Sequence, residues 1–465
     1  AISRSSFKVF ILVIFIFCIA LSLAEETASL RSLFAAVQKS EPLRASVWLV
    51  EKERAKKDSL KAAFFPKIGA SVGAEQTNQP SVFQAYRTLT LGLQAEWNLF
   101  DGFRSTLAKE AQESLLASSV ENEESTRQKL YLQVIEHYYG YFKAKSLLQA
   151  LAAQQHELEA NLARLERFYE NGLSGLDALE ALRAQIAQNA YQRNSAILLA
   201  QTHSENLEWL TQKPFADVVS PSQQSHSNPC ELPDTAPMPS FHFSQIALPL
   251  LHDSPSAQAE SMLLLTPSPS AELRAFDKQL DALHARIGAY NYLPKVDVFA
   301  RAGYYHFDKF YIPKLPTLPF ALTIDDSELH GVQATIGLQV VFPLFDTFAV
   351  QKEREAARYE YLSAQSQYQH QLRYQSHQVK IAQNALENAR QKITWTKTQA
   401  KSARIAYCYA QKKFPPGLIS HTEYLTSLAT DVAARASFEE SFLDYEMAKA
   451  QMIFASGGKL EDFIQ

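Results

Sequence analysis

The feature that most limits the possible folds of this chain is a strand-like segment that leads directly into a very long helix-like segment. From Thr88 to Leu99, polar and apolar residues alternate with the two-residue period of a strand that has one apolar face. The alternation stops at Asp101-Gly102, and a helical pattern then continues over about 105–170. Such a helix is roughly 100 Å long, whereas helices in compact domains average about 11 residues. We therefore expect an elongated protein built on long helices.

The same junction occurs a second time. A second alternating segment, residues 333–346, also ends in Phe-Asp and enters another long helical segment. Asp101 lies 71 residues before Gly172, and Asp346 lies 71 residues before Gly417. A spacing that is repeated at this scale predicts one structural unit used twice.

The breaks in these patterns divide the chain into predicted parts. We expect a signal peptide over 1–24 and a first repeat over 25–212, with strands about 67–99 and a long helix about 105–170. A Pro/Ser-rich linker over 213–267 follows. The second repeat is expected over 268–458, with strands about 295–345 and a long helix about 347–414, and a C-terminal tail over 459–465. Shorter helical segments are expected over 30–63, 176–212, 268–292 and 420–456. Their lengths allow two of them to stack end to end along each long helix as a two-stranded coil, with Leu151, Leu158 and Leu165 in a heptad seam.

The N-terminal segment has the layout of a secretory signal. Arg4 and Lys8 precede an almost uninterrupted apolar run from Val9 to Leu23, and Glu25-Glu26 follows. We expect cleavage after Ala24. The alternative is an uncleaved membrane anchor, for which the run is short. No other segment is apolar enough for a transmembrane helix, so strands are the only other means of entering a membrane.

The remaining residues give no indication of catalysis. Cys230 and Cys408 lie in contexts so different that we expect no disulfide bond between them. His226, His242 and His252 share the linker with Cys230 but lack the spacing of metal ligands, so we expect no metal and no cofactor. No phosphate-binding loop is present, and the formal net charge of −4 gives no indication of nucleic-acid binding. We expect that the protein is not an enzyme.

The four alternating segments have the length of tilted transmembrane strands with one apolar face toward lipid. Four strands cannot close a barrel, and an open edge in lipid leaves backbone groups unpaired at several kcal/mol each. Closure therefore requires several copies of the chain, and three copies give about 12 strands around an aqueous lumen. The side chains expected to face that water are those of Gln94, Glu96, Asn98, Asp297, Arg301, Gln333 and Gln339. The alternative is a soluble β-sandwich cap whose apolar face is buried in protein.

Taken together, these residues resemble the TolC family of outer-membrane efflux ducts. The resemblance rests on the signal segment, the duplicated strand pair, the junction Trp97-Asn-Leu-Phe-Asp-Gly102, and the turn Gly172-Leu-Ser before Asp177-Ala-Leu-Glu-Ala-Leu-Arg-Ala. It implies a homotrimer, mainly α-helical, with a 12-stranded β-barrel in the outer membrane of a Gram-negative-type bacterium and a 12-helix coiled-coil tunnel in the periplasm. It also implies two protein partners, a periplasmic adaptor of the membrane fusion type and an inner-membrane pump or transporter.

The resemblance further implies an adaptor-binding tip at the two Gly-Leu turns. In this sequence the tip residues are Asn171, Gly172 and Leu173, and Pro416, Gly417 and Leu418. The alternative is that both glycines serve only as helix C-caps. Ser174 with Asp177, after the first turn, matches the pattern of a capping box.

The resemblance also implies carboxylates that ring the closed entrance of the duct and favour cations. Glu423, six residues after Gly417, occupies one such position, whereas Thr426 occupies the next. Glu423 also matches a capping box with Ser420, which is an alternative reason for its presence.

We therefore expect a passive exit duct of a tripartite efflux or type I secretion system, opened by its adaptor and pump. The alternative is a structural or adhesive surface protein that uses a coiled coil as a spacer and the loop 305–331 as its contact surface.

Overall fold

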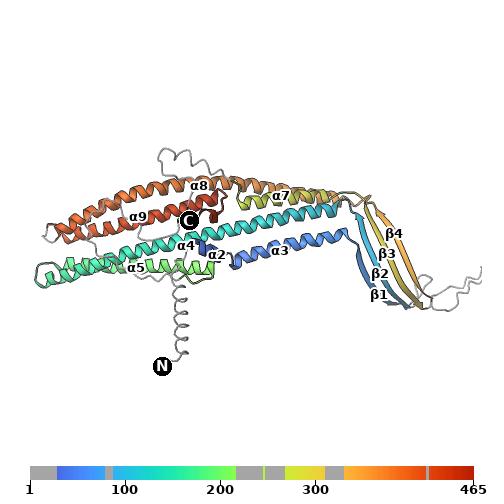
Figure 1. The fold of residues 1–465 in the computed structure, drawn as a ribbon, viewed down its shortest axis with the longest axis horizontal. Helices are drawn as coiled ribbons and strands as arrows, with labels where there is room; N and C mark the ends of the chain where they lie inside the picture. The colour runs from blue at the N-terminus through green and yellow to red at the C-terminus, as the bar shows by residue number, and fades with distance from the viewer. Residues whose placement is uncertain are drawn as a thin grey trace, which may run out of the picture. The chain divides into compact units, whose positions relative to one another are not determined.

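The computed structural model describes residues 29–78, 87–215, 245–246, 268–308, 329–414 and 418–464. The predicted signal peptide lies outside these residues, as do most of the linker and the middle of the loop 305–331. The elements shown in Figure 1 are α2 (Leu30–Val37), α3 (Glu41–Lys61), the 3-10 helix η1 (Ala62–Phe64), β1 (Lys67–Gln76), β2 (Arg87–Phe100), α4 (Arg104–Glu170), α5 (Leu176–Thr211), α7 (Ala271–Ala289), β3 (Lys295–Asp308), β4 (Leu329–Val341), α8 (Ala349–Lys413), α9 (His421–Ala455) and the 3-10 helix η2 (Leu460–Phe463). The expected mainly helical fold with a small β part is confirmed.

The chain divides into two compact units. Unit 1 comprises 1–46, 123–272 and 371–465, and unit 2 comprises 47–122 and 273–370. None of the helices that the structure describes is both long and apolar enough to span a membrane.

In unit 2, the four strands form one antiparallel sheet in the order β1-β2-β3-β4 (Figure 1). The register aligns Ile68, Ala95, Ala300 and Ile336 across the sheet, which gives one apolar face. The side chains of Ile68 and Ile336 are 78% and 80% exposed. The seven residues predicted to face water all lie on the opposite face, where the register pairs Asn98 with Asp297 and Asp297 with Gln339.

The two strand-to-helix junctions have the same local geometry. The carboxylate of Asp101 accepts a hydrogen bond from the backbone N–H of Ser105, and that of Asp346 accepts one from the N–H of Val350, each at 2.8 Å. In both junctions the next two residues have positive φ angles, from 57° to 72°. The aspartate of each Phe-Asp pair thus satisfies a free donor in the first turn of a long helix.

The predicted helix over 30–63 is interrupted, because α2 ends at Val37 and α3 begins at Glu41. Pro42 explains the break. Inside a continuous helix it would lack the N–H that bonds the carbonyl of Gln38, and its ring would clash with that carbonyl. In the first turn of a new helix, proline has neither cost.

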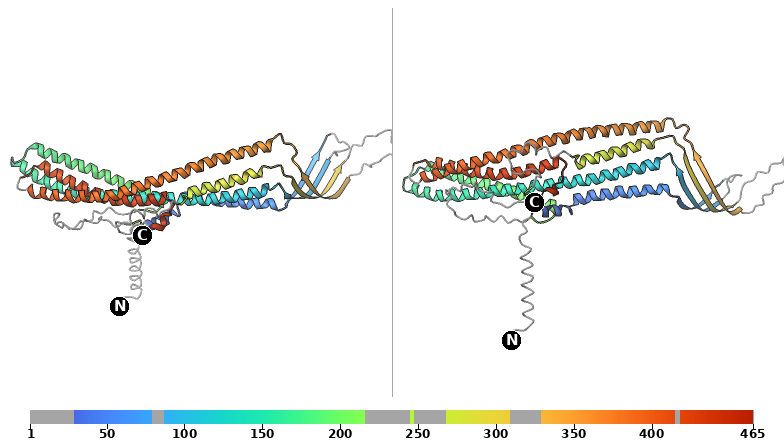
Figure 2. Two further views of the ribbon diagram at one scale, coloured as in Figure 1. Left: turned by 90° about the horizontal axis from the view of Figure 1, so that it is seen from above. Right: turned by 45° about the horizontal axis from the view of Figure 1, so that its top comes forward.

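In unit 1, α5 lies along α4 and α9 lies along α8 in both views of Figure 2. The predicted heptad seam of α4 is buried, with Leu151, Leu158 and Leu165 at most 5% exposed. The amide of Asn189, on α5, donates to the carbonyl of Leu151 at 3.1 Å and to Oε1 of Gln155 at 2.7 Å. A buried amide in the seam fixes the register of the two helices, because any shift would leave it unpaired.

One carboxylate connects three helices of unit 1. Asp444, on α9, accepts hydrogen bonds from Nζ of Lys143 on α4 at 2.7 Å and from Nζ of Lys392 on α8 at 2.6 Å. The pKa of Asp444 is lowered by these two lysines, against the opposing effect of its burial. The carboxylate is therefore ionised at neutral pH.

A buried ion pair holds Ile246, one of the few linker residues that the structure describes. Glu446 and Lys449 of α9 lie 2.6 Å apart, and each side chain is 9% exposed. The backbone N–H of Ile246 donates to Glu446 at 2.8 Å, and its carbonyl accepts from Lys449 at 2.7 Å. The side chain of Ile246 is buried in the largest hydrophobic cluster, and its backbone bridges to Ile464. The pair thus satisfies both backbone groups of one linker residue.

Cys408 of α8 is disulfide-bonded, and its partner lies outside the described residues. The expectation that Cys230 and Cys408 form no disulfide bond with each other stays a prediction, because Cys230 lies outside the described residues.

We predict that Lys449→Ala lowers the free energy of unfolding by about 3 kcal/mol, because it leaves the carboxylate of Glu446 buried without its cation. Lys278→Ala is the matched control, since Lys278 forms an ion pair of the same i,i+3 spacing with Asp281 on an exposed face. The control should lose less than about 0.5 kcal/mol. Denaturant unfolding of both variants measures the difference, and equal losses would contradict the role given to the buried pair.

Candidate functional site

The first tip turn is a Schellman motif formed by Asn171, Gly172 and Leu173 at the end of α4. The N–H of Leu173 donates to the carbonyl of Phe168 at 2.8 Å, and the N–H of Gly172 donates to the carbonyl of Tyr169 at 2.9 Å. Gly172 has a φ of +72°, and an added Cβ would meet no atom within 4 Å. Backbone conformation, not space, therefore requires glycine here.

The predicted capping box of Ser174 and Asp177 is wrong. The N-cap of α5 is Gly175, and it makes no side-chain capping bond. The chain turns one residue later than the pattern indicated, which places the Asp177 carboxylate against Gly175 at the point where a Cβ would lie. Asp177 still lies in the first turn, where the helix dipole favours a carboxylate.

The second tip turn follows α8. The structure places Leu418, whose N–H donates to the carbonyl of Lys413 at 3.1 Å, whereas Pro416 and Gly417 lie outside the described residues. The exposed fractions of the two tip leucines are similar, 75% for Leu173 and 72% for Leu418. Each turn thus presents one large apolar side chain to solvent.

The predicted capping box of Ser420 and Glu423 at the start of α9 is confirmed. The N–H of Ser420 donates to Oε2 of Glu423 at 2.9 Å, and the N–H of Glu423 donates to Oγ of Ser420 at 3.2 Å. Glu423 is exposed at the N-terminus of the helix. Its structural role is therefore established, and its role in a gate stays a prediction.

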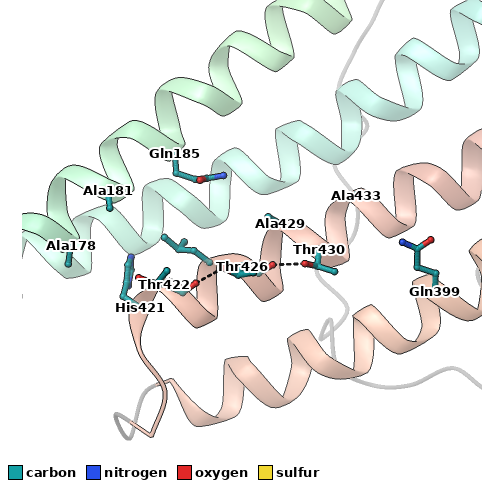
Figure 3. Close-up of a pocket in the computed structure, with 11 residues that line it drawn as sticks. Ala178, Ala181, Gln185, Gln399, His421, Thr422, Thr426, Ala429, Thr430 and Ala433 are labelled. Atoms are coloured by element: carbon teal, nitrogen blue, oxygen red, sulfur yellow. Dashed lines mark hydrogen bonds between the residues drawn. The ribbon is translucent and has the colours of Figure 1, made fainter.

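A groove of about 510 Å³ lies between α5 and α9 beside these turns (Figure 3). It is lined by Ala178, Ala181, Gln185, Gln399, His421, Thr422, Leu425, Thr426, Ala429, Thr430 and Ala433. The hydroxyl groups of Thr426 and Thr430 each donate to the carbonyl four residues earlier at 2.8 Å. These threonines therefore present mainly their methyl groups, and most of the lining side chains are small, since seven of the eleven are alanine or threonine.

His421 was not identified from the sequence as part of this site. Both of its ring nitrogens are buried without a hydrogen-bond partner among the described residues, and the ring lies 5.4 Å from that of Phe414. Burial lowers the pKa of His421, so the ring is neutral at pH 7. No sequence signal distinguishes it, because its surroundings depend on how α5 packs beside α9.

Two helices carry stripes of exposed apolar side chains. On α8, Tyr374, Ile381, Trp395 and Tyr409 are separated by seven or fourteen residues and are 47–63% exposed. On α5, Tyr191, Leu198 and Trp209 lie on one face and are 64–73% exposed. Exposed apolar surface in such an ordered pattern marks an interaction site.

Comparisons with known proteins identify relatives of the sequence and of the fold. Residues 33–210 and 269–458 match the sequence model described as "Outer membrane efflux protein". Among curated proteins there is no significant match.

Several solved structures have the same fold. The outer membrane channel CmeC of Campylobacter jejuni is 18% identical, with a TM-score of 0.72, over 92% of this chain and 85% of CmeC. The outer membrane protein VceC of Vibrio cholerae is 16% identical, with a TM-score of 0.71, over 93% of this chain and 96% of VceC. The MtrE channel of Neisseria gonorrhoeae, solved in its open state, is 17% identical, with a TM-score of 0.67, over 93% and 89% of the two chains.

We predict that Gly172→Ala destabilises the protein by about 1 kcal/mol, because a residue with a Cβ is strained at this positive φ. Gly172→Asn should lose less, because asparagine tolerates the left-handed region better. Thermal unfolding of the two variants and the wild type gives the order. If alanine proves as stable as asparagine, the turn does not depend on its left-handed residue.

Proposed function

The chain belongs to the outer membrane efflux protein family, and from this premise we propose that three copies form the outer-membrane exit duct of a tripartite efflux or type I secretion system. The duct carries out no reaction and has no energy source of its own. An adaptor and an inner-membrane pump or transporter open it and drive export. The family match covers both halves of the chain and supports this function over the alternative of an adhesive surface protein with a coiled-coil spacer.

The observation that carries the proposal is the open sheet of unit 2. Its apolar face suits lipid, but among the described residues neither β1 nor β4 has a strand partner on its outer side. In lipid, the unpaired N–H and C=O groups of two edges have no water to bond. Pairing β4 of each copy with β1 of the next removes every edge, and three copies give about 12 strands.

The exposed stripes of unit 1 support the same assembly. The α8 stripe of Tyr374, Ile381, Trp395 and Tyr409 keeps a seven-residue period, which is typical of a helix that packs against another helix. A neighbouring copy that covers this stripe, and the α5 stripe with Tyr191, extends the barrel into a tunnel of helices. Lipid covers the apolar face of the strands, and protein covers the stripes.

The tip turns and the adjoining groove form the surface for the adaptor. Leu173 and Leu418 project from the turns, and the small side chains of the groove allow another helix to approach closely. A helical hairpin with a few apolar residues at its end fits both features. Pro416 and Gly417 belong to this proposed contact by their position in the sequence.

Glu423 is the proposed gate residue. Three copies place three of these exposed carboxylates around one axis at the narrow end of the tunnel. A ring of carboxylates favours cations and opposes anions.

We predict that deletion of the gene raises the intracellular level of an exported solute and that the wild-type gene restores export. The double variant Leu173→Asp, Leu418→Asp should reach the membrane but fail to restore export, because two charges replace the apolar contacts of the tip. The double variant Leu173→Met, Leu418→Met is the control and should restore export. Full export by the aspartate variant would show that the adaptor does not bind at Leu173 and Leu418.

We predict that Glu423→Gln reduces the preference for cations in planar bilayers. Glutamine keeps the capping box but removes the charge, so the start of α9 stays intact. Glu159→Gln, on an exposed face of α4, is the control and should leave selectivity unchanged. Unaltered selectivity in Glu423→Gln would limit this residue to its capping role.

A further inference from the structure

Two histidines from different helices of unit 1 meet at their ring nitrogens. Nδ1 of His137, on α4, lies 3.2 Å from Nδ1 of His203, on α5. The ring centroids are 5.4 Å apart, and the ring planes are inclined by 51°. The tip and the strands do not involve this pair, and neither residue stood out in the sequence.

The packing of α4 makes room for this arrangement. Gly140 lies one turn after His137, in the interior of a long helix, where glycine costs about 1 kcal/mol relative to alanine. An added Cβ at Gly140 would lie 2.6 Å from Nε2 of His203, well inside van der Waals contact. The missing side chain thus provides the space in which the His203 ring reaches His137.

Burial keeps both rings neutral. Burial lowers the pKa of both histidines, and a proton on His137 or the charge of Lys143 lowers that of His203 further. The carboxylate of Glu136 acts in the opposite direction on both rings. The charge of Lys143 is itself paired with Asp444 at 2.7 Å and with Glu440 at 2.9 Å. Neutral imidazole is the form that binds metal ions.

We propose that His137 and His203 form a binding site for one divalent transition-metal ion. The separations of 3.2 Å between the Nδ1 atoms and 5.4 Å between the ring centroids place the two nitrogens nearly head-on. A metal ion at the usual distance of about 2.1 Å from each Nδ1 would make an N–metal–N angle of roughly 100°, so each ring turns by roughly 40° to direct its lone pair at the ion. The described residues contain no group of three or more potential ligands among His, Cys, Asp and Glu. Water therefore completes the coordination, and both side chains are only partly buried, which admits it.

The metal-free pair is held by a hydrogen bond from one Nδ1–H to the other Nδ1. When the ion binds, that proton moves to Nε2 of the same ring, so both rings stay neutral and no proton is released to solvent. Imidazole ligands favour Cu²⁺, Ni²⁺ and Zn²⁺ over Mg²⁺ and Ca²⁺. The ion connects α4 to α5 beside the aromatic cluster that contains Tyr138, Tyr139 and Phe142.

The test titrates Zn²⁺ into the intact protein, purified without a polyhistidine tag and stripped with a chelator, by calorimetry. We expect one ion per chain and a higher thermal midpoint with the ion bound. His137→Ala and His203→Ala should each weaken binding at least about tenfold. Even the loss of a residue that only hydrogen-bonds a metal ligand typically lowers metal affinity by about tenfold or more. Gly140→Ala should do the same, since it displaces the His203 ring. Affinity should fall as the pH drops through the lowered pKa values, because protons then compete for both rings.

The control is the cross-strand pair His306 and His330 of the sheet, whose ring centroids lie 6.4 Å apart. The double variant His306→Ala, His330→Ala should retain the full affinity. Folding of each variant is checked by its thermal midpoint without metal. The proposal is overturned if the wild type does not bind Zn²⁺, or if folded His137→Ala and His203→Ala bind as tightly as the wild type. The pair would then serve only as a hydrogen bond between two helices, and the proposed duct would be unaffected.

Discussion

Every backbone N–H and C=O group inside lipid needs a hydrogen-bond partner within the protein. This requirement determines whether a four-stranded sheet can enter a membrane alone or only together with other copies. Four strands in sequence order give three paired interfaces and two edges. The apolar face of the sheet makes lipid its natural surroundings, yet lipid is the solvent in which open edges cost most. In our proposal the copies of the chain therefore remove the edges by pairing with one another.

In our proposal the long helices continue the duct beyond the strands. The carboxylates of Asp101 and Asp346 each cap a helix of more than 60 residues, the first directly after β2 and the second a few residues after the end of β4. Within unit 1, the buried leucine seam and the Asn189 amide hold α5 in register along α4. The stripes that remain exposed are explained most simply by contacts between copies.

The sequence alone was sufficient to predict the features that depend on short-range patterns. Alternation predicted the strands and the face occupied by Arg301, and the seven-residue period predicted the Leu158 seam. The spacing of Ser420 and Glu423 predicted their capping box. The exact ends of helices were harder to predict. Pro42 lay within an otherwise continuous helical pattern, and Gly175 holds the N-cap position that was expected for Ser174.

Contacts between distant residues could not be predicted in this way. The disulfide bond of Cys408, the buried surroundings of His421 and the meeting of His137 with His203 all depend on which helix faces which. No periodicity of a single segment contains that information. The space at Gly140 is an example, since a glycine inside a helix is only an unfavourable residue until the ring that fills the space is known.

The native mass of the mature protein extracted in detergent, determined by mass spectrometry, tests this assembly of copies. We expect a complex of three chains that requires detergent to stay in solution, because each sheet completes the barrel of its neighbours. A single chain that remains soluble without detergent would contradict it.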